Sequence, residues 1–148
     1  MDIVTAVSRR VRAEVDSGTP HCVYVLGTRK TFEHALYEHD LAEEGVNTCA
    51  LAEGQRERVY DSILAVKAGR VEEGGNLLRG VVDELVRDTP AGVSVHLVLG
   101  CTELPLAAAA AGLLPEPVGA VTQARGVTWY DSLGVLVDAV VGSARAPR

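Results

Sequence analysis

The sequence has no surplus of basic side chains. Its 148 residues include 14 Lys and Arg against 20 Asp and Glu, which gives a net charge of −6. Consecutive Lys or Arg residues occur only as the pairs Arg9–Arg10 and Arg29–Lys30. Proteins that bind a phosphate backbone without base specificity depend on clustered positive charge. The composition therefore argues against nucleic acid as a partner.

Long apolar runs are also missing. The first sixteen residues, MDIVTAVSRRVRAEVD, do not contain the apolar core of a signal peptide. Elsewhere no apolar run reaches the length that a membrane-spanning helix needs. We therefore expect a cytoplasmic protein with no membrane partner.

Cysteine is scarce, and its spacing is uninformative for cross-links. Cys22, Cys49 and Cys101 are odd in number and far apart in the sequence. Neither a disulfide framework nor a paired-cysteine zinc site is indicated, and the four histidines show no ligand spacing. We expect three reduced thiols and no metal site. Cys22 and Cys49 lie inside apolar runs, where packing is their expected role.

Apolar segments of two kinds alternate along the chain, at the periods of helices and of strands. Helices are predicted over 2–16, 28–45, 53–69, 71–87, 104–114 and 132–144, and strands over 22–27, 46–51 and 94–100; residues 115–121 are expected to form a loop or a short strand. No internal repeat or second domain is visible. Strands that alternate with helices favour a parallel sheet covered on both faces. The expected fold is a single α/β domain over 1–148, a parallel sheet flanked by helices.

Two turns follow predicted strands, at the edge where such sheets hold their ligands. The turn LGTRKT contains Gly27, Thr28 and Thr31, and the turn LGCTEL contains Gly100, Cys101, Thr102 and Glu103. Glycine lets a backbone approach a ligand, and the free N–H groups that begin a helix can hold a carboxylate. We expect the two turns to form one substrate-binding site.

Cys101 is the candidate for chemistry at this site. The start of a helix directly after it favours the thiolate over the thiol, and Glu103 could orient a proton there. These features predict proton transfer or nucleophilic attack. The alternative interpretation is that a cysteine after an apolar strand is a small buried hydrophobic residue.

Several segments together are similar to one known family. They are VYVLGTRKTFEHALYEHDLAEEGV, VKAG, LVLGCTELPL and YDSLGVLVDAVV, and the similarity extends from about Val4 to Val141. They resemble the second of the two similar α/β halves of the aspartate/glutamate racemase superfamily. The resemblance implies one half of that fold, with the first half and its cysteine absent.

The resemblance also implies roles for individual residues. In that family two cysteines, one from each half, face each other across the substrate Cα, and Cys101 matches the second. Glu103 would support this thiol. Thr28 and Thr31 would hold a substrate carboxylate, and Lys67 matches a lysine that pairs with the side-chain carboxylate in aspartate racemases. Without the resemblance, the two threonines could equally cap the next helix, and Lys67 could be a solvated surface residue.

Three function classes remain open. The first is a cofactor-independent, cysteine-dependent racemase or isomerase that acts next to a carboxylate. It would need the missing half from a second copy of the chain or from another protein. The second is a decarboxylase, lyase or cyclase that needs a single thiol, and the third is a non-catalytic binding module. The intact GCTE turn favours the first two, with a small carboxylate or amino-acid-like substrate and a homodimer as the expected assembly.

Overall fold

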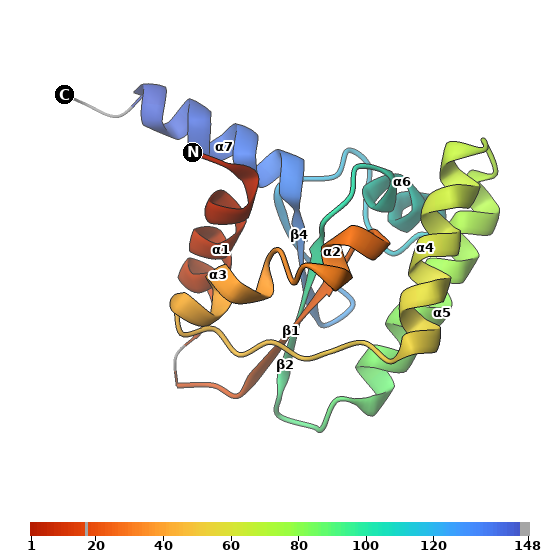
Figure 1. The fold of residues 1–148 in the computed structure, drawn as a ribbon, viewed down its shortest axis with the longest axis horizontal. Helices are drawn as coiled ribbons and strands as arrows, with labels where there is room; N and C mark the ends of the chain where they lie inside the picture. The colour runs from red at the N-terminus through yellow and green to blue at the C-terminus, as the bar shows by residue number, and fades with distance from the viewer. Residues whose placement is uncertain (17, 146–148) are drawn as a thin grey trace.

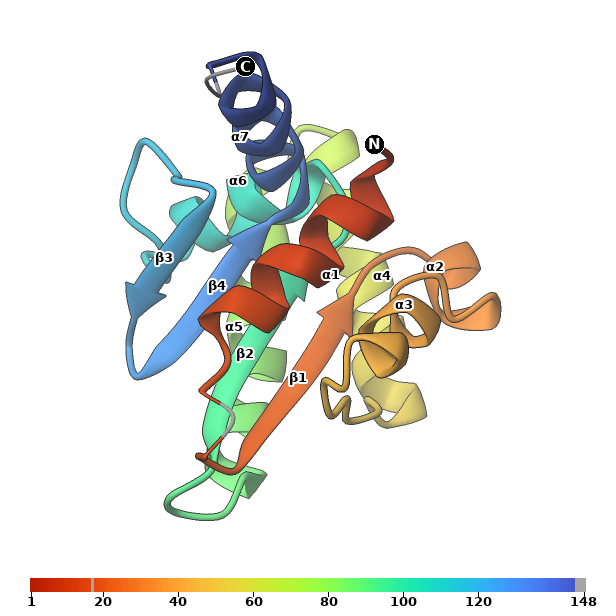
Figure 2. The same ribbon diagram turned by 90° about the vertical axis from the view of Figure 1, so that its left-hand side faces the viewer.

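The computed structural model, which describes residues 1–16 and 18–145, contains a four-stranded sheet. Its strands are β1 (His21–Leu26), β2 (Ser94–Leu99), β3 (Val121–Ala124) and β4 (Val127–Asp131), arranged in the order β1-β2-β4-β3. β1, β2 and β4 run parallel, and β3 runs antiparallel to β4 at the sheet edge (Figure 2). The expected α/β class with a mostly parallel sheet is confirmed.

Helices cover both faces of this sheet (Figure 1). They are α1 (Ile3–Glu14), α2 (Arg29–Glu33), α3 (Glu38–Glu43), α4 (Glu53–Lys67), α5 (Val71–Asp88), α6 (Glu103–Ala110) and α7 (Ser132–Arg145). α1, α3 and α7 form one layer, and α4, α5 and α6 form the other. None of the helices in the described residues is long and apolar enough to cross a membrane.

The strands are apolar on both sides because both sides are covered. In β1, Val23 and Val25 pack into the core beneath α1, whereas Tyr24 and Leu26 pack into the core beneath α4 and α5. Successive side chains of a strand point to opposite faces, so a strand buried on both faces is a continuous apolar run. This explains why the sequences of β1 and β2 predicted strands so clearly.

The single helix predicted over 28–45 is wrong. The chain forms α2 and α3 instead, and Ala35 between them has a left-handed backbone with φ 48°. The break turns Tyr37 into the core, where its hydroxyl donates to Ser132 Oγ at 3.3 Å. A tertiary contact therefore overrides a helical sequence pattern. The predicted end at Gly45 is confirmed, since this glycine has φ 75°.

Strands β3 and β4 were not predicted as a pair. They form a hairpin whose two connecting residues, Arg125 and Gly126, have φ values of 56° and 73°. Positive φ at both positions is the geometry of a type I′ turn. The predicted strand 46–51 forms one isolated parallel bridge, between Val23 and Thr48, and no regular strand.

The expectation of three reduced thiols is contradicted. Cys22 and Cys49 form a disulfide, with their Cα atoms 5.7 Å apart, and Cys101 is the free cysteine. The two partners are 27 residues apart in the sequence, but the Val23–Thr48 bridge lays the chain before α4 along β1. This tertiary pairing was invisible in the sequence because spacing alone does not show which segments become neighbours.

Candidate active site

The two predicted turns lie side by side at the carboxyl edge of the sheet. β1 and β2 are paired in register up to Leu26 and Leu99. Directly beyond this pair, the N–H of Gly100 donates to the carbonyl oxygen of Leu26 at 2.7 Å. The expectation that the turns are adjacent is therefore confirmed.

Contacts within the chain leave little room for a side chain at either glycine of these turns. A Cβ at Gly27 would lie 2.8 Å from the hydroxyl oxygen of Thr31, a distance that real Cβ atoms essentially never show. A Cβ at Gly100 would lie 3.0 Å from the carbonyl oxygen of Leu26, so this neighbour would have to move by a few tenths of an ångström. Close packing of the two turns therefore explains the glycines without any ligand.

The threonines of the first turn cap the helix that follows them. Thr28 is the N-cap of α2, and its hydroxyl oxygen accepts from the backbone N–H of Thr31 at 3.5 Å. The two hydroxyl oxygens lie 3.2 Å apart, and Thr31 is buried. Capping, the alternative considered from the sequence, is thus one role of this pair.

The Glu103 carboxylate accepts hydrogen bonds from the polar groups of the second turn. The Cys101 thiol donates to Glu103 Oε2 at 2.7 Å, and the Thr102 hydroxyl donates to the same oxygen at 3.1 Å. The Nζ of Lys67, at the end of α4, lies 4.0 Å from Glu103 Oε1. Residues from two separate parts of the sequence therefore meet at one carboxylate.

The electrostatics of this cluster differ from the prediction. Burial and the hydrogen bond to Glu103 raise the pKa of the Cys101 thiol. The backbone N–H of Glu103, at the start of α6, lowers that pKa as expected, but its effect is smaller. The expected thiolate is therefore wrong for the resting site, where Cys101 is a neutral thiol at neutral pH. The pKa of Glu103 is lowered, mainly by the hydrogen bond from Cys101, so the carboxylate is ionised.

Two further polar residues that the sequence did not single out lie beside Cys101. Asp131, the last residue of β4, and Ser132, the first of α7, line a small cavity together with Cys101. The Ser132 hydroxyl donates to the carbonyl oxygen of Leu99 at 2.8 Å and accepts from Tyr37. Burial raises the pKa of Asp131. The sequence could have pointed to these residues, because an apolar strand followed directly by Asp-Ser is typical of a helix that begins at a sheet edge.

The cavity beside Cys101 is too small to enclose a substrate. Its volume is about 70 Å³, which corresponds to roughly two water molecules at about 30 Å³ each. Ligand pockets that bury most of a small molecule are several times larger. This cavity therefore does not bury a small molecule by itself.

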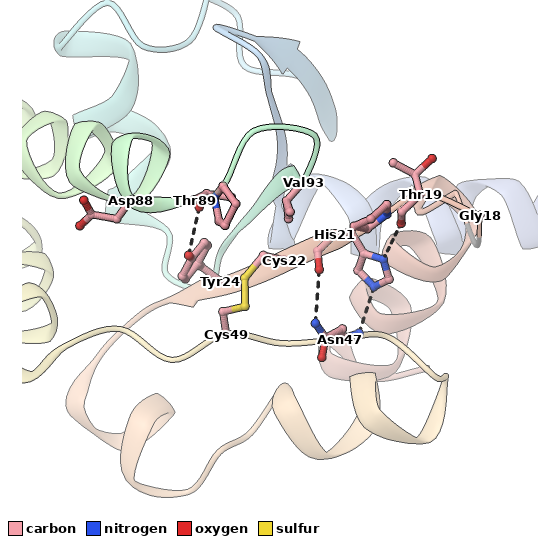
Figure 3. A pocket seen from close by; sticks show the side chains of 12 residues that line it. Gly18, Thr19, His21, Cys22, Tyr24, Asn47, Cys49, Asp88, Thr89 and Val93 are labelled. Carbon is pink, nitrogen blue, oxygen red and sulfur yellow. Dashed lines mark hydrogen bonds between the residues drawn. A yellow bond between two sulfur atoms is a disulfide. The ribbon is translucent and has the colours of Figure 1, made fainter.

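A larger cavity of about 590 Å³ lies at the opposite end of β1 and contains none of the predicted site residues (Figure 3). Its polar groups are already paired with one another. Tyr24 Oη lies 3.2 Å from Thr89 Oγ1, and the backbone N–H of Asn47 donates to His21 Nε2 at 3.1 Å. This cavity offers space but few free groups for chemistry.

No metal centre is formed by the described part of the chain. Nowhere in it do three His, Cys, Asp or Glu side chains lie close enough to hold a metal ion. The Glu103 carboxylate faces hydrogen-bond donors, namely the Cys101 thiol, the Thr102 hydroxyl and the Lys67 ammonium. This arrangement suits proton transfer.

No model of a known protein family matches the chain. One curated relative is 33% identical over 84 residues, which are 57% of this chain and 53% of the relative. It is described as an uncharacterised protein in the pnlA 3′ region of Pectobacterium carotovorum subsp. carotovorum. The chain therefore spans about half the length of this relative.

Solved structures of aspartate racemase homologues share the fold. The aspartate racemase of Picrophilus torridus has a TM-score of 0.68 at 21% identity, with 97% of this chain and 52% of that chain covered. An aspartate racemase homologue from Pyrococcus horikoshii has a TM-score of 0.71 at 22% identity, with coverages of 99% and 56%. A candidate Asp/Glu racemase from Yersinia pestis has a TM-score of 0.71 at 22% identity, with 97% of this chain and 55% of that chain covered. The chain therefore has the fold of about one half of these proteins, which confirms the half-fold that the sequence resemblance implied.

Proposed function

We propose that the chain is a cysteine-dependent proton-transfer enzyme that acts on a carbon next to a carboxylate, as an isomerase or racemase. The observation that carries the proposal is the Cys101 thiol bonded to the Glu103 carboxylate at 2.7 Å. This pair lies at the carboxyl edge of a parallel sheet, where ligands of such sheets bind. It does so in the fold of half an aspartate racemase.

Glu103 acts as the proton acceptor that activates Cys101. When a substrate displaces water, the carboxylate takes the thiol proton, and the resulting thiolate removes the proton on the substrate carbon. The electron pair of that C–H bond passes into the neighbouring carboxylate group as an enediolate. A donor on the opposite face returns a proton and inverts the carbon. An acid and a base with pKa values suited to this exchange accelerate it by about 10²–10⁴-fold.

The substrate carboxylate is held by groups around this pair. Lys67 is exposed and lies 4.0 Å from Glu103, so its ammonium can also reach an incoming anion. The Thr28 and Thr102 hydroxyls are on the two turns, and Thr31 fixes Thr28. These donors favour a small carboxylate or an amino-acid-like substrate. The proposed chemistry needs no cofactor.

The described residues offer no second free thiol for the opposite face. Cys101 is the one free cysteine among them, and Cys22 lies at the far end of β1 in a disulfide. In the proposed reaction the donor on that face comes from a second copy of the chain or from another protein, and a homodimer would supply a second copy of the Cys101 site.

A second function is favoured by the same single thiol. A decarboxylase, lyase or cyclase needs only one acid or base on one face of the carbon. Cys101 is a neutral thiol in the resting site, which suits a group that donates a proton. A binding module without chemistry is the remaining alternative, and the same experiment distinguishes all three.

The test is incorporation of deuterium at Cα. Candidate amino acids and dicarboxylic acids are incubated with the protein in heavy water, and exchange and stereochemistry are followed by NMR. Exchange with inversion supports the isomerase, whereas a changed carbon skeleton or released carbon dioxide supports the single-thiol enzyme. Cys101→Ser should lower turnover at least about 100-fold, since a hydroxyl is too weak an acid and base at neutral pH.

The control is the double variant Cys22→Ser/Cys49→Ser, which removes the other two sulfur atoms. Both lie away from the carboxyl edge, so the folded variant should keep its turnover. Circular dichroism checks that each variant is folded. Full activity of Cys101→Ser, or no reaction of any candidate with the wild-type protein, would reject the catalytic thiol and favour the binding module.

A further inference from the structure

The Cys22–Cys49 disulfide borders the cavity at the far end of β1. Cys22 is in β1, Cys49 is in the segment that precedes α4, and both line this cavity of about 590 Å³ (Figure 3). Pockets that hold small molecules have volumes of about 300–1,000 Å³. A small molecule therefore has room to reach the disulfide while the chain stays folded.

The disulfide is the reactive group of this cavity. The polar side chains around it are paired with one another, as Tyr24 is with Thr89 and His21 with the backbone of Asn47. A disulfide, in contrast, reacts with thiolates, and the rate depends on the access to the sulfur atom that is attacked. The chemical class that can react in this cavity is therefore a small thiol.

The two sulfur atoms differ in access. Cys22 is only 6% exposed and pairs in register with Val95 in the interior of the sheet. Cys49 is half-buried and packs at the border of the same core. An incoming thiolate therefore reaches Sγ of Cys49 more readily than Sγ of Cys22. The Cys22 thiol that is released is then a small hydrophobic residue in the core.

The two cysteines are held together by more than their own bond. The N–H of Val23 donates to the carbonyl oxygen of Asn47 at 3.2 Å, and the N–H of Cys49 donates to the carbonyl oxygen of Val23 at 2.9 Å. The side chain of Asn47 also donates to the carbonyl oxygen of His21 at 3.3 Å. These bonds keep the segment beside β1 when the disulfide is open. The two sulfur atoms therefore remain neighbours, and the disulfide can form again.

We propose that the Cys22–Cys49 disulfide is a site of reversible exchange with low-molecular-weight thiols, which enter through the cavity and attack Cys49. The thiolate forms a bond to Sγ of Cys49, the bond between the two cysteines breaks, and Cys22 leaves as a thiolate that takes up a proton. A second molecule of the thiol then attacks the mixed disulfide. The two thiol molecules are oxidised to their disulfide, and the protein gains two electrons and two protons.

The first test uses glutathione as the thiol. The folded protein is equilibrated with different ratios of reduced to oxidised glutathione, quenched with acid, and analysed by mass spectrometry. The Cys22–Cys49 disulfide should be present at high proportions of oxidised glutathione and should open as reduced glutathione increases. At intermediate ratios a species heavier by one glutathione molecule should appear, and peptide mapping should place the addition on Cys49.

Two single-cysteine variants compare the sulfur atoms directly. Both carry Cys101→Ser, because a free Cys101 would also react. With Cys22→Ser, the remaining Cys49 should form its mixed disulfide with oxidised glutathione at least about tenfold faster than Cys22 does with Cys49→Ser. Circular dichroism checks that both variants are folded, and neither measurement depends on turnover at Cys101.

A change of charge tests the route of entry. Asp88 is exposed and lines the cavity, and reduced glutathione carries a net negative charge at neutral pH. Asp88→Asn should therefore speed the reaction with glutathione about two- to fivefold at low salt, but not the reaction with the neutral β-mercaptoethanol. Asp83→Asn is the matched control, because Asp83 is exposed on the same helix but does not line the cavity.

Several results would overturn the proposal. They are a disulfide that opens only when urea unfolds the chain, glutathione on Cys22 in place of Cys49, and no disulfide even in oxidised glutathione alone. Equal rates with glutathione for Asp88→Asn and Asp83→Asn would reject the cavity as the route of entry.

Discussion

At the scale of single residues, burial and Glu103 together keep Cys101 protonated. Burial raises the pKa of the thiol most, because it disfavours the charged thiolate. The Glu103 carboxylate accepts from the thiol at 2.7 Å and acts in the same direction. Lys67 acts in the opposite direction, and its effect is smaller. The reactivity of the thiol therefore depends on its burial and on two neighbouring charges of opposite sign.

Glu103→Gln should make the resting Cys101 thiol more reactive towards an alkylating agent at neutral pH, although the same change removes the base that the proposed turnover requires. The change removes the negative charge beside the thiol, so the pKa of Cys101 falls and more thiolate is present. Each unit by which this pKa falls should increase the rate of alkylation by iodoacetamide about tenfold at pH 7. The wild-type rate should keep rising with pH above neutrality, because its pKa is raised. Mass spectrometry of the Cys101 peptide measures both profiles.

Lys67→Met provides the opposite change at the same site. Without the ammonium the pKa of Cys101 should rise, and alkylation at pH 7 should slow. Glu73→Gln is a neutral control, since Glu73 pairs with Arg70 on the surface of α5. If Glu103→Gln and Lys67→Met changed the rate in the same direction, the charge-based explanation would be wrong.

At the scale of helices and strands, local patterns predicted the elements whose contacts are local. The apolar runs of β1 and β2 and the stripe of α5 were correct, because burial on one or both sides leaves a regular period. β4 was missed, although Trp129 and Tyr130 are fully buried in it. Its partner β3 is short, and the Arg125–Gly126 turn lacks the Asn-Gly sequence that usually marks such hairpins.

The candidate site was predictable to the same extent. The turns around Gly27 and Gly100 follow two strands that the sequence predicts clearly. Parallel strands end at the same edge of a sheet, so the adjacency of the two turns could be inferred. The raised pKa of Cys101 could not be inferred, because it depends on the hydrogen bond between the thiol and the Glu103 side chain, which the sequence does not show. Tyr37 reaches the site only because the chain breaks at Ala35, a tertiary effect without a local signal.

Gly100→Ala should destabilise the junction of the two turns. A Cβ there would lie 3.0 Å from the carbonyl oxygen of Leu26 and 3.2 Å from Cε2 of Tyr37. The same carbonyl accepts the Gly100 N–H, so the backbone has little freedom to move away. Overpacking of this kind costs about 1–3 kcal/mol. Urea unfolding should show this loss as a lower midpoint.

Gly54→Ala is the matched control for Gly100→Ala. Gly54 is in the first turn of α4, and nothing lies within 4 Å of the added Cβ. Both changes reduce the entropy of the unfolded chain equally, so their difference isolates the contact at Gly100. Gly54→Ala should raise stability by up to about 1 kcal/mol. Equal midpoints for the two variants would show that the junction tolerates a side chain.

At the scale of the whole molecule, charge and exposed apolar surface act against each other in self-association. Two copies with a net charge of −6 each repel over the range that salt does not screen. Exposed apolar side chains such as Leu133, Val137 and Val140 of α7 contribute attraction that does not depend on charge. The balance between the two should therefore depend on ionic strength.

Dimerisation should become stronger as salt is added. The distance over which charges interact falls from about 20 Å or more at about 0.02 M salt to less than about 5 Å at about 0.5 M. The repulsion between copies is then screened, while attraction between apolar side chains persists. Sedimentation velocity at both salt concentrations should therefore show a lower dimer Kd at the higher one. A Kd that rises with salt would mean that ion pairs, and not apolar side chains, hold the two copies together.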